Sequence, residues 1–82
     1  MPVRIEYKAA VEKDLRKLDK HEALRVIDKL EKVLSANPNA GEALSGEYKG
    51  LFKFRVGDYR IMYAKKPDGV LVVRIRHRKH AY

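Results

Sequence analysis

The spacing of apolar residues changes period twice along this chain, and that change is the strongest constraint on its fold. Val3, Ile5 and Tyr7 alternate with polar residues, as in a half-buried strand. From residue 8 the apolar residues recur at helical spacing, and from residue 51 they alternate again. Because the chain has only 82 residues, these segments must share one core. We therefore expect a single α+β domain over residues 1–82: an N-terminal strand, a two-helix hairpin, then a three-stranded antiparallel meander.

The helical segment is predicted to contain two helices, the first ending near residue 18. Asp19 is predicted to cap the second helix, with Glu22 in the capping-box position. The residues expected to face the core are Val11, Leu15 and Leu18 in the first helix and Leu24, Ile27, Leu30 and Leu34 in the second, with Val26 and Val33 at its edges. Asn37-Pro38 ends the second helix, because proline cannot continue the helical hydrogen-bond ladder. Residues 37–50 contain three of the five glycines and are expected to form a surface loop.

Two short turns are predicted to set the register of the meander. Gly57-Asp58 is a two-residue turn between strands at 51–56 and 59–65, so Val56 pairs with Tyr59. Lys66-Pro67-Asp68-Gly69 suits a type I turn with Gly69 in the left-handed position after it. Lys66 is then expected to pair with Val70, at the start of a last strand at 70–78. The residues expected to face the helices are Phe52, Phe54, Val56, Tyr59, Ile61, Tyr63, Leu71, Val73 and Ile75.

The positive charge is confined to the second part of the chain. The net charge is +8, yet residues 1–48 carry equal numbers of basic and acidic residues. Residues 49–82 hold many Lys and Arg against only Asp58 and Asp68. This one-sided excess indicates a polyanionic partner: nucleic acid, an acidic protein segment, or both. An anionic membrane is disfavoured, because the basic segment predicts strands rather than an amphipathic helix.

The predicted register also groups arginines on the outer face of the sheet. Arg55 lies opposite Arg60, and Arg60 lies opposite Arg76. The neighbouring row then holds Lys53, Met62 and Arg74. Like charges opposite one another destabilise a sheet by about 0.2–1 kcal/mol, so folding alone gives no reason for this arrangement. A single exposed arginine needs no function, but several on one face favour an anion site, since guanidinium donors match phosphate oxygens.

Several classes of protein and site are excluded or disfavoured. The chain has no cysteine, which removes disulfides and cysteine-based metal sites. The longest aliphatic run, residues 70–73, is far shorter than the ~18 residues that span a bilayer, and the N-terminus lacks a signal peptide's apolar stretch. We expect a small cytoplasmic protein. No acidic residue is expected on the arginine face, which disfavours a two-metal nuclease, and no nucleotide-binding motif is present, so no metal or cofactor is predicted.

Two segments of the sequence resemble a known family. Residues 50–63, GLFKFRVGDYRIMY, are preceded by LSG at 44–46 and resemble the central signature of the RelE/ParE superfamily of toxins from type II toxin–antitoxin systems. Residues 73–82, VRIRHRKHAY, resemble its C-terminal segment. The order of strand, helices and meander is also that of the RelE-like fold, so the resemblance covers essentially the whole chain.

The resemblance implies a toxin with a cognate antitoxin as its partner. Toxins of the RelE branch are endoribonucleases that cut mRNA in the ribosomal A site, whereas those of the ParE branch poison DNA gyrase. We favour the RelE-like branch: a metal-independent, ribosome-dependent mRNA endoribonuclease that blocks translation, monomeric within its antitoxin complex. The alternatives are a ParE-like gyrase inhibitor and a non-catalytic RNA-binding protein on the same fold.

The resemblance also implies site residues, and chemistry suggests their roles. The positions that match the functional residues of the RelE branch are Lys53, Arg55, Arg60, Arg78 and Tyr82. If the 2′-hydroxyl of RNA attacks the adjacent phosphorus, Arg60 and Arg78 would stabilise the added charge, supported by Arg55 and Arg76. Further phosphate contacts are predicted for Lys49 and Arg74.

Proton transfer needs a different set of side chains, because a guanidinium is a poor proton donor. The candidates are Lys53, His77, His80 and Tyr82. Strand parity turns His77 away from the arginine face, so it ranks below His80, and a packing or capping role is expected for it. Tyr82 would assist proton transfer or stack on a base.

Overall fold

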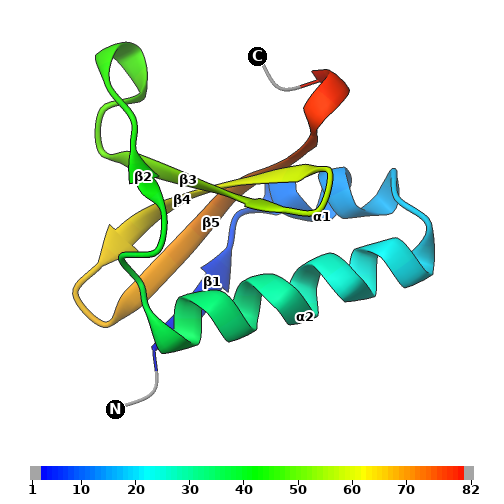
Figure 1. Cartoon of the computed structure of the whole chain (residues 1–82), viewed down its shortest axis with the longest axis horizontal. Coiled ribbons are helices and arrows are strands. Elements are labelled where there is room, and N and C mark those ends of the chain that lie inside the picture. The colour runs from blue at the N-terminus through cyan, green and yellow to red at the C-terminus, as the bar shows by residue number, and fades with distance from the viewer. Residues whose placement is uncertain (1–2, 81–82) are drawn as a thin grey trace.

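The computed structural model describes residues 3–80 and contains five strands in one sheet with two α-helices (Figure 1). In chain order the elements are β1 (Arg4–Tyr7), α1 (Ala9–Arg16), α2 (Lys20–Ala36), β2 (Glu42–Ala43), the 3₁₀ helix η1 (Gly46–Tyr48), β3 (Leu51–Val56), β4 (Tyr59–Lys66), β5 (Gly69–His77) and the 3₁₀ helix η2 (Arg78–His80). The predicted α+β class and the order of its elements are confirmed.

The strand order in the sheet is β1-β5-β4-β3-β2. Strands β3, β4 and β5 form the predicted antiparallel meander, whereas β1 lies parallel to the first half of β5. The close approach of these two strands requires Gly69, because a Cβ there would lie 1.8 Å from the carbonyl oxygen of Arg4. β1 pairs with β5 only as far as Val72, so the remainder of β5 has no strand partner on that side within the described chain.

The core lies between the helices and one face of the sheet, and α2 runs along that face (Figure 1). Its fully or almost fully buried apolar residues include Val11, Val26, Leu30, Leu34, Ile61, Tyr63, Val70, Val72 and Ile75. Neither helix of residues 3–80 is long and apolar enough to cross a membrane.

The second helix differs from the prediction at its N-terminal end. Leu24 is 60% exposed, whereas Val26, which was predicted at the edge of the stripe, is buried. Val26 begins a row at four-residue spacing that faces the sheet, and Leu24 lies about 200° around the helix from it. The helix starts after Asp19 as predicted, but the capping box does not form: Asp19 makes no side-chain capping bond, and Glu22 pairs with Arg25 at 3.2 Å.

The register of the last hairpin was predicted wrongly at the turn and correctly at the arginines. The turn contains only Pro67-Asp68, so Lys66 pairs with Gly69 rather than with Val70. A β-bulge then inserts one extra residue in β5, since Tyr63 pairs with Val72 but Met62 pairs with Arg74. The two one-residue shifts cancel.

The bulge also changes which residues of β5 enter the core. Before it, Val70 and Val72 are fully buried, whereas Leu71 and Val73, which were predicted to face the helices, are only partly buried. After the bulge the predicted parity is restored, and Ile75 is 3% exposed.

Candidate phosphate-binding site

The predicted arginine row exists in the backbone register. Arg55 pairs with Arg60 across β3 and β4, and Arg60 pairs with Arg76 across β4 and β5. The turn at Gly57-Asp58 places the first pair, because Gly57 supplies a positive φ of 58° that a two-residue hairpin needs. The side chains of directly opposed residues in antiparallel strands project from the same face of the sheet. The Cα atoms of the three arginines therefore lie on neighbouring strands at the same level, with their side chains on one face.

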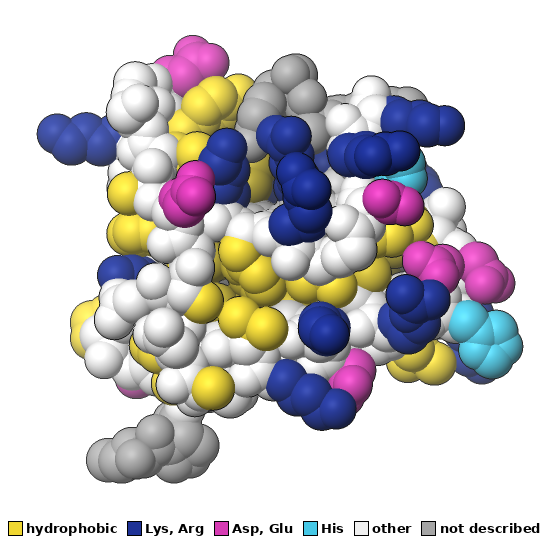
Figure 2. Space-filling model, in the orientation of Figure 1, with side chains coloured by type: hydrophobic (Ala, Val, Ile, Leu, Met, Phe, Trp, Pro, Cys, Tyr) yellow, Lys and Arg dark blue, Asp and Glu magenta, His cyan; other side chains and the backbone are white. Residues whose placement is uncertain are grey.

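A hollow of about 320 Å³ lies on this face of the sheet. Its lining residues are Ala40, Glu42, Lys53, Phe54, Arg55 and Arg60. Figure 2 shows Lys and Arg side chains gathered on one part of the surface, with an acidic side chain beside them. Three of the predicted site residues, Lys53, Arg55 and Arg60, therefore border one cavity that is large enough for a phosphodiester group.

The prediction that no acidic residue lies on this face is wrong. Residues 42–43 form the short strand β2, which adds to the edge of the sheet beside β3 and puts Glu42 opposite Lys53. We predicted a loop here from the glycines of residues 37–50, and a strand of two residues is too short to show an alternating pattern. The acidic residue could be found only from the strand pairing.

Arg76 borders a second hollow, of about 430 Å³, on the side toward α1. Lys17, Tyr59 and His77 also line it. The structure thus puts Arg76 beside Arg60 in register but at a different cavity from Arg55 and Arg60.

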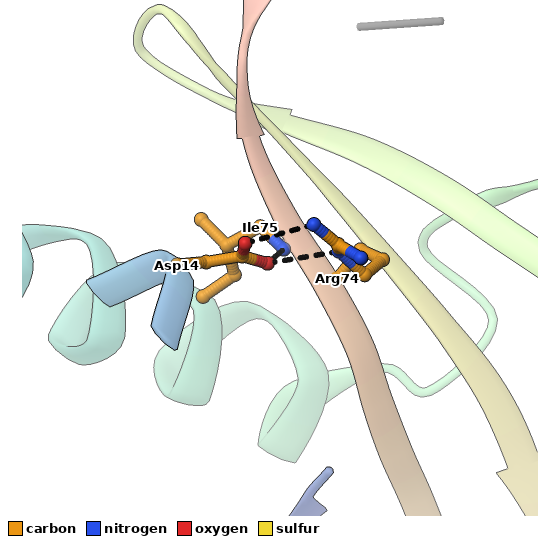
Figure 3. A network of polar contacts seen from close by, with 3 residues as sticks. All are labelled: Asp14, Arg74 and Ile75. Carbon is orange, nitrogen blue, oxygen red and sulfur yellow. Dashed lines mark hydrogen bonds and ion pairs between the residues drawn. The ribbon is translucent and has the colours of Figure 1, made fainter. Parts of the chain in front are cut away.

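Arg74 has a partner within the protein (Figure 3). Its Nε and Nη2 atoms donate to the two carboxylate oxygens of Asp14 at 3.1 and 3.0 Å, and the Ile75 N–H donates to the same carboxylate at 3.0 Å. Asp14 is 6% exposed and is carried by α1. This bidentate pair anchors α1 to β5 beyond the end of β1, and it uses guanidinium donors that we had assigned to phosphate.

The remaining predicted residues lie around the end of β5 or outside the described part of the chain. Arg78 is exposed, its N–H donates to the carbonyl of Asp58 at 2.8 Å, and its Nε lies 3.8 Å from the Asp58 carboxylate. Lys49 is exposed just after η1 and borders neither hollow. His80 ends η2, but its side chain is not among the described ones, and Tyr82 lies outside the described residues.

His77 has the packing role expected of it. Its ring meets the ring of Tyr59 edge-on at 5.2 Å, and its Nδ1 accepts a hydrogen bond from the Lys79 N–H at 3.2 Å. Burial and the neighbouring carboxylates of Glu22 and Asp58 raise the pKa of Tyr59. This tyrosine therefore stays neutral beside His77 at physiological pH.

Tyr63 is a buried polar group that sequence analysis treated only as a core residue. Its ring is fully buried between Phe52 and Phe54, at centroid distances of 5.6 and 5.9 Å. Its hydroxyl accepts a bond from the Gly41 N–H and donates one to the carbonyl of Pro38, each at 2.9 Å. Burial raises its pKa, so the hydroxyl stays protonated and able to donate. Tyr63 thereby ties the segment before β2 to the core.

The described residues contain no group of three or more His, Asp or Glu side chains arranged to hold a metal ion. What the hollow offers is cationic hydrogen-bond donors on two rigid strands, next to one carboxylate.

Comparison with known proteins identifies the family. The family model for the ParE toxin of the type II toxin–antitoxin system parDE matches residues 5–82. A comparison with curated protein sequences finds no match.

Solved toxin structures share the fold. A chain of the Mycobacterium tuberculosis toxin–antitoxin complex RelBE2 superposes with a TM-score of 0.86 at 28% identity, covering 94% of this chain and 99% of that one. A chain of the RelB–RelE antitoxin–toxin complex from Methanococcus jannaschii gives a TM-score of 0.66 at 26% identity, covering 90% and 91%. A chain of the archaeal RelE–RelB complex from Pyrococcus horikoshii, at 22% identity and a TM-score of 0.72, covers 99% of this chain and 100% of that chain and supports the fold. Since the family match extends over nearly all of the sequence, the chain belongs to the ParE toxin family of type II toxin–antitoxin systems.

Proposed function

We propose that this toxin is an endoribonuclease that cuts mRNA on the ribosome and so blocks translation. The observation that carries the proposal is the hollow that Lys53, Arg55 and Arg60 border on the outer face of the sheet. Two guanidinium groups there can hold the non-bridging oxygens of a phosphodiester in bidentate fashion. The likeness to RelE-type toxins, including the RelBE2 complex at 28% identity, supports the same branch.

The chemistry needs no group beyond the protein and the RNA. The 2′-hydroxyl of the RNA attacks the adjacent phosphorus and expels the 5′-oxygen, leaving a 2′,3′-cyclic phosphate. The transition state carries extra negative charge on the phosphoryl oxygens, and preorganised cations such as Arg60 and Arg55 stabilise it more than they stabilise the ground state. Lys53 can protonate the leaving oxygen. Arg78, His80 and Tyr82 remain proposed contributors from the C-terminal segment.

A protein antitoxin is proposed as the physiological partner. Several related structures are complexes with antitoxins, among them RelBE2 and the Escherichia coli DinJ–YafQ complex. An acidic segment that folds onto the sheet would neutralise the basic face, and apolar side chains exposed near that face could pack against it (Figure 2).

A second candidate function is inhibition of DNA gyrase. It is favoured by the matching family model, which describes the ParE toxin of parDE systems. The two functions predict different products, because a gyrase inhibitor leaves mRNA intact.

The test is in vitro translation with the purified chain, with cut sites mapped by primer extension. We expect cuts at fixed positions within codons, and we expect Arg60→Ala to slow them by about 10²–10³-fold, as is typical for loss of one transition-state donor. Arg25→Ala, at an exposed position on α2, is the matched control and should cut at the wild-type rate.

Two results would contradict the proposal. Intact mRNA together with inhibited gyrase supercoiling would assign the chain to the alternative function. Wild-type cutting by a folded Arg60→Ala variant would show that the site lies elsewhere.

A further inference from the structure

The hollow contains one side chain whose chemistry differs from that of its neighbours. Lys53, Arg55 and Arg60 carry only hydrogen-bond donors, whereas the carboxylate of Glu42 carries only acceptors. The pairing of Glu42 with Lys53 puts their Cβ atoms about 4.5–5.5 Å apart on one face of the sheet. Within residues 3–80 neither of these two side chains is held in an ion pair, so both can meet a ligand.

The backbone that carries Glu42 is held in place from the core. Tyr63 engages the Gly41 N–H and the Pro38 carbonyl immediately before β2. Gly41 is packed so closely that a Cβ there would lie 2.7 Å from the Tyr63 hydroxyl and 2.8 Å from the carbonyl oxygen of Lys53. After β2, the Leu44 N–H donates to the carbonyl of Leu51 at 2.9 Å. A segment predicted to be a surface loop is therefore fixed on both sides of residue 42.

We propose that Glu42 is the proton acceptor of the cleavage reaction and that Tyr63 is its positioning residue. The inference rests on the proposed ribonuclease function. Cleavage by 2′-hydroxyl attack needs one group that removes a proton, and among the described residues lining the hollow Glu42 alone is an acceptor without a proton to give.

The step balances within this pair of side chains and the RNA. The 2′-O–H proton moves to the Glu42 carboxylate as the O2′–P bond forms. The P–O5′ bond breaks, and the 5′-oxygen takes a proton from the Lys53 ammonium. The products are a 2′,3′-cyclic phosphate and a 5′-hydroxyl, and exchange of one proton with water returns each side chain to its starting form.

The electrostatic setting explains how a carboxylate can work beside a phosphate. The charged groups that border the same hollow are Lys53 and Arg55 from β3 and Arg60 from β4. Three cations against one carboxylate leave the hollow positive, so it can still attract RNA.

Glu42→Gln is the first test, because it keeps the shape of the side chain and removes its basicity. Single-turnover cutting of mRNA on purified ribosomes should fall by about 10²–10⁴-fold, the usual contribution of a general base. Binding of a short RNA should be unchanged or tighter, because one negative charge leaves the basic face. Glu47→Gln in the nearby η1 is the matched control and should cut normally.

The positioning role of Tyr63 is tested by Tyr63→Phe, which keeps the buried ring and removes only the hydroxyl. We expect the cutting rate to fall while the affinity for RNA stays constant. In the Glu42→Gln background the same change should cause no further loss, because Tyr63 acts through Glu42. Additive losses would show that Tyr63 acts independently of Glu42 and would overturn its positioning role.

The outcomes separate this inference from the proposed function. A wild-type chain that leaves mRNA intact overturns the ribonuclease proposal, and the proton-acceptor role falls with it. If the wild type cuts and Glu42→Gln cuts equally fast, only the inference is overturned. It is also overturned if Glu42→Gln loses RNA binding and cutting in parallel, since that result assigns Glu42 to binding.

Discussion

At the scale of single residues, the buried Asp14 binds Arg74, so that this arginine has a structural role in place of the predicted phosphate contact. Its buried carboxylate accepts three hydrogen bonds, two from Arg74 and one from the Ile75 N–H. Ile75 lies in the part of β5 beyond its pairing with β1. The Asp14 carboxylate therefore accepts a hydrogen bond from a backbone N–H that would otherwise need water. Arg74 is best understood as the counter-ion of this carboxylate.

Replacing Asp14 should therefore cost stability. We expect Asp14→Ala to lower the free energy of unfolding by about 2–3 kcal/mol, because it leaves a backbone N–H and a partly buried guanidinium without their acceptor. Urea denaturation followed by circular dichroism measures this change. Asp28→Ala, which removes an exposed i,i+4 pair with Lys32, should cost no more than about 0.5 kcal/mol. Equal costs for the two variants would contradict the structural role given to Asp14.

At the scale of elements, β1 and α2 are joined by a single strong polar contact. The hydroxyl of Tyr7 donates to the Glu31 carboxylate at 2.5 Å across the edge of the core. Burial, reinforced by this bond and by the negative charge of Glu31, raises the pKa of Tyr7 well above its ordinary value of 10.0. The bond exists only while the hydroxyl keeps its proton.

This contact predicts how stability changes in alkali. The folded chain holds the Tyr7 proton at pH values where the unfolded chain releases it, so the contribution of Tyr7 is complete below about pH 10 and is lost as the pH rises further. Tyr7→Phe should be less stable than the wild type at pH 8, and the difference should narrow above pH 10. Denaturation midpoints of the wild type and of Tyr7→Phe at several pH values measure this difference. A constant difference across this range would refute the explanation.

At the scale of the whole molecule, the charge is divided between the two parts of the chain. Residues 49–82 carry the whole excess of +8, and β3, β4, β5 and η2 lie within this range. Residues 1–48, which include both α-helices, carry balanced charge, and these helices pack on the opposite face of the sheet. The molecule is therefore expected to approach a polyanion with the sheet face that bears the arginines.

Salt dependence tests this orientation. The affinity for a short single-stranded RNA should fall as salt rises, with a slope of about −0.7 per phosphate neutralised. The Arg55→Ala, Arg60→Ala double variant should bind with a slope shallower by about 1.4, whereas Arg25→Ala should keep the wild-type slope. Identical slopes for the three proteins would place RNA on another surface.

Much of the fold could be predicted because it depends on local patterns. The period of the apolar residues identified the first strand, both helices and the meander, and Gly57-Asp58 set the register of Arg55 with Arg60. The prediction for Arg76 was right through two compensating errors, because the shorter turn at Pro67-Asp68 and the bulge in β5 shift the register in opposite directions. Leu24 was misassigned because it lies about 200° around the helix from Val26, outside the row that faces the sheet, and the spacing alone did not show which of the two belongs to the core.

The sequence by itself determined the order of the elements, the hairpin turn at Gly57-Asp58 and the concentration of positive charge after residue 48. These depend on neighbours in the chain, where side-chain period and turn chemistry act directly. Three contacts were decided only by the tertiary structure. Asp14 forms an ion pair with Arg74, the Tyr63 hydroxyl holds the backbone at Gly41, and Glu42 pairs with Lys53 across two strands. Each of these contacts joins residues at least ten positions apart, and a contact of that kind depends on where the packed core brings distant segments together.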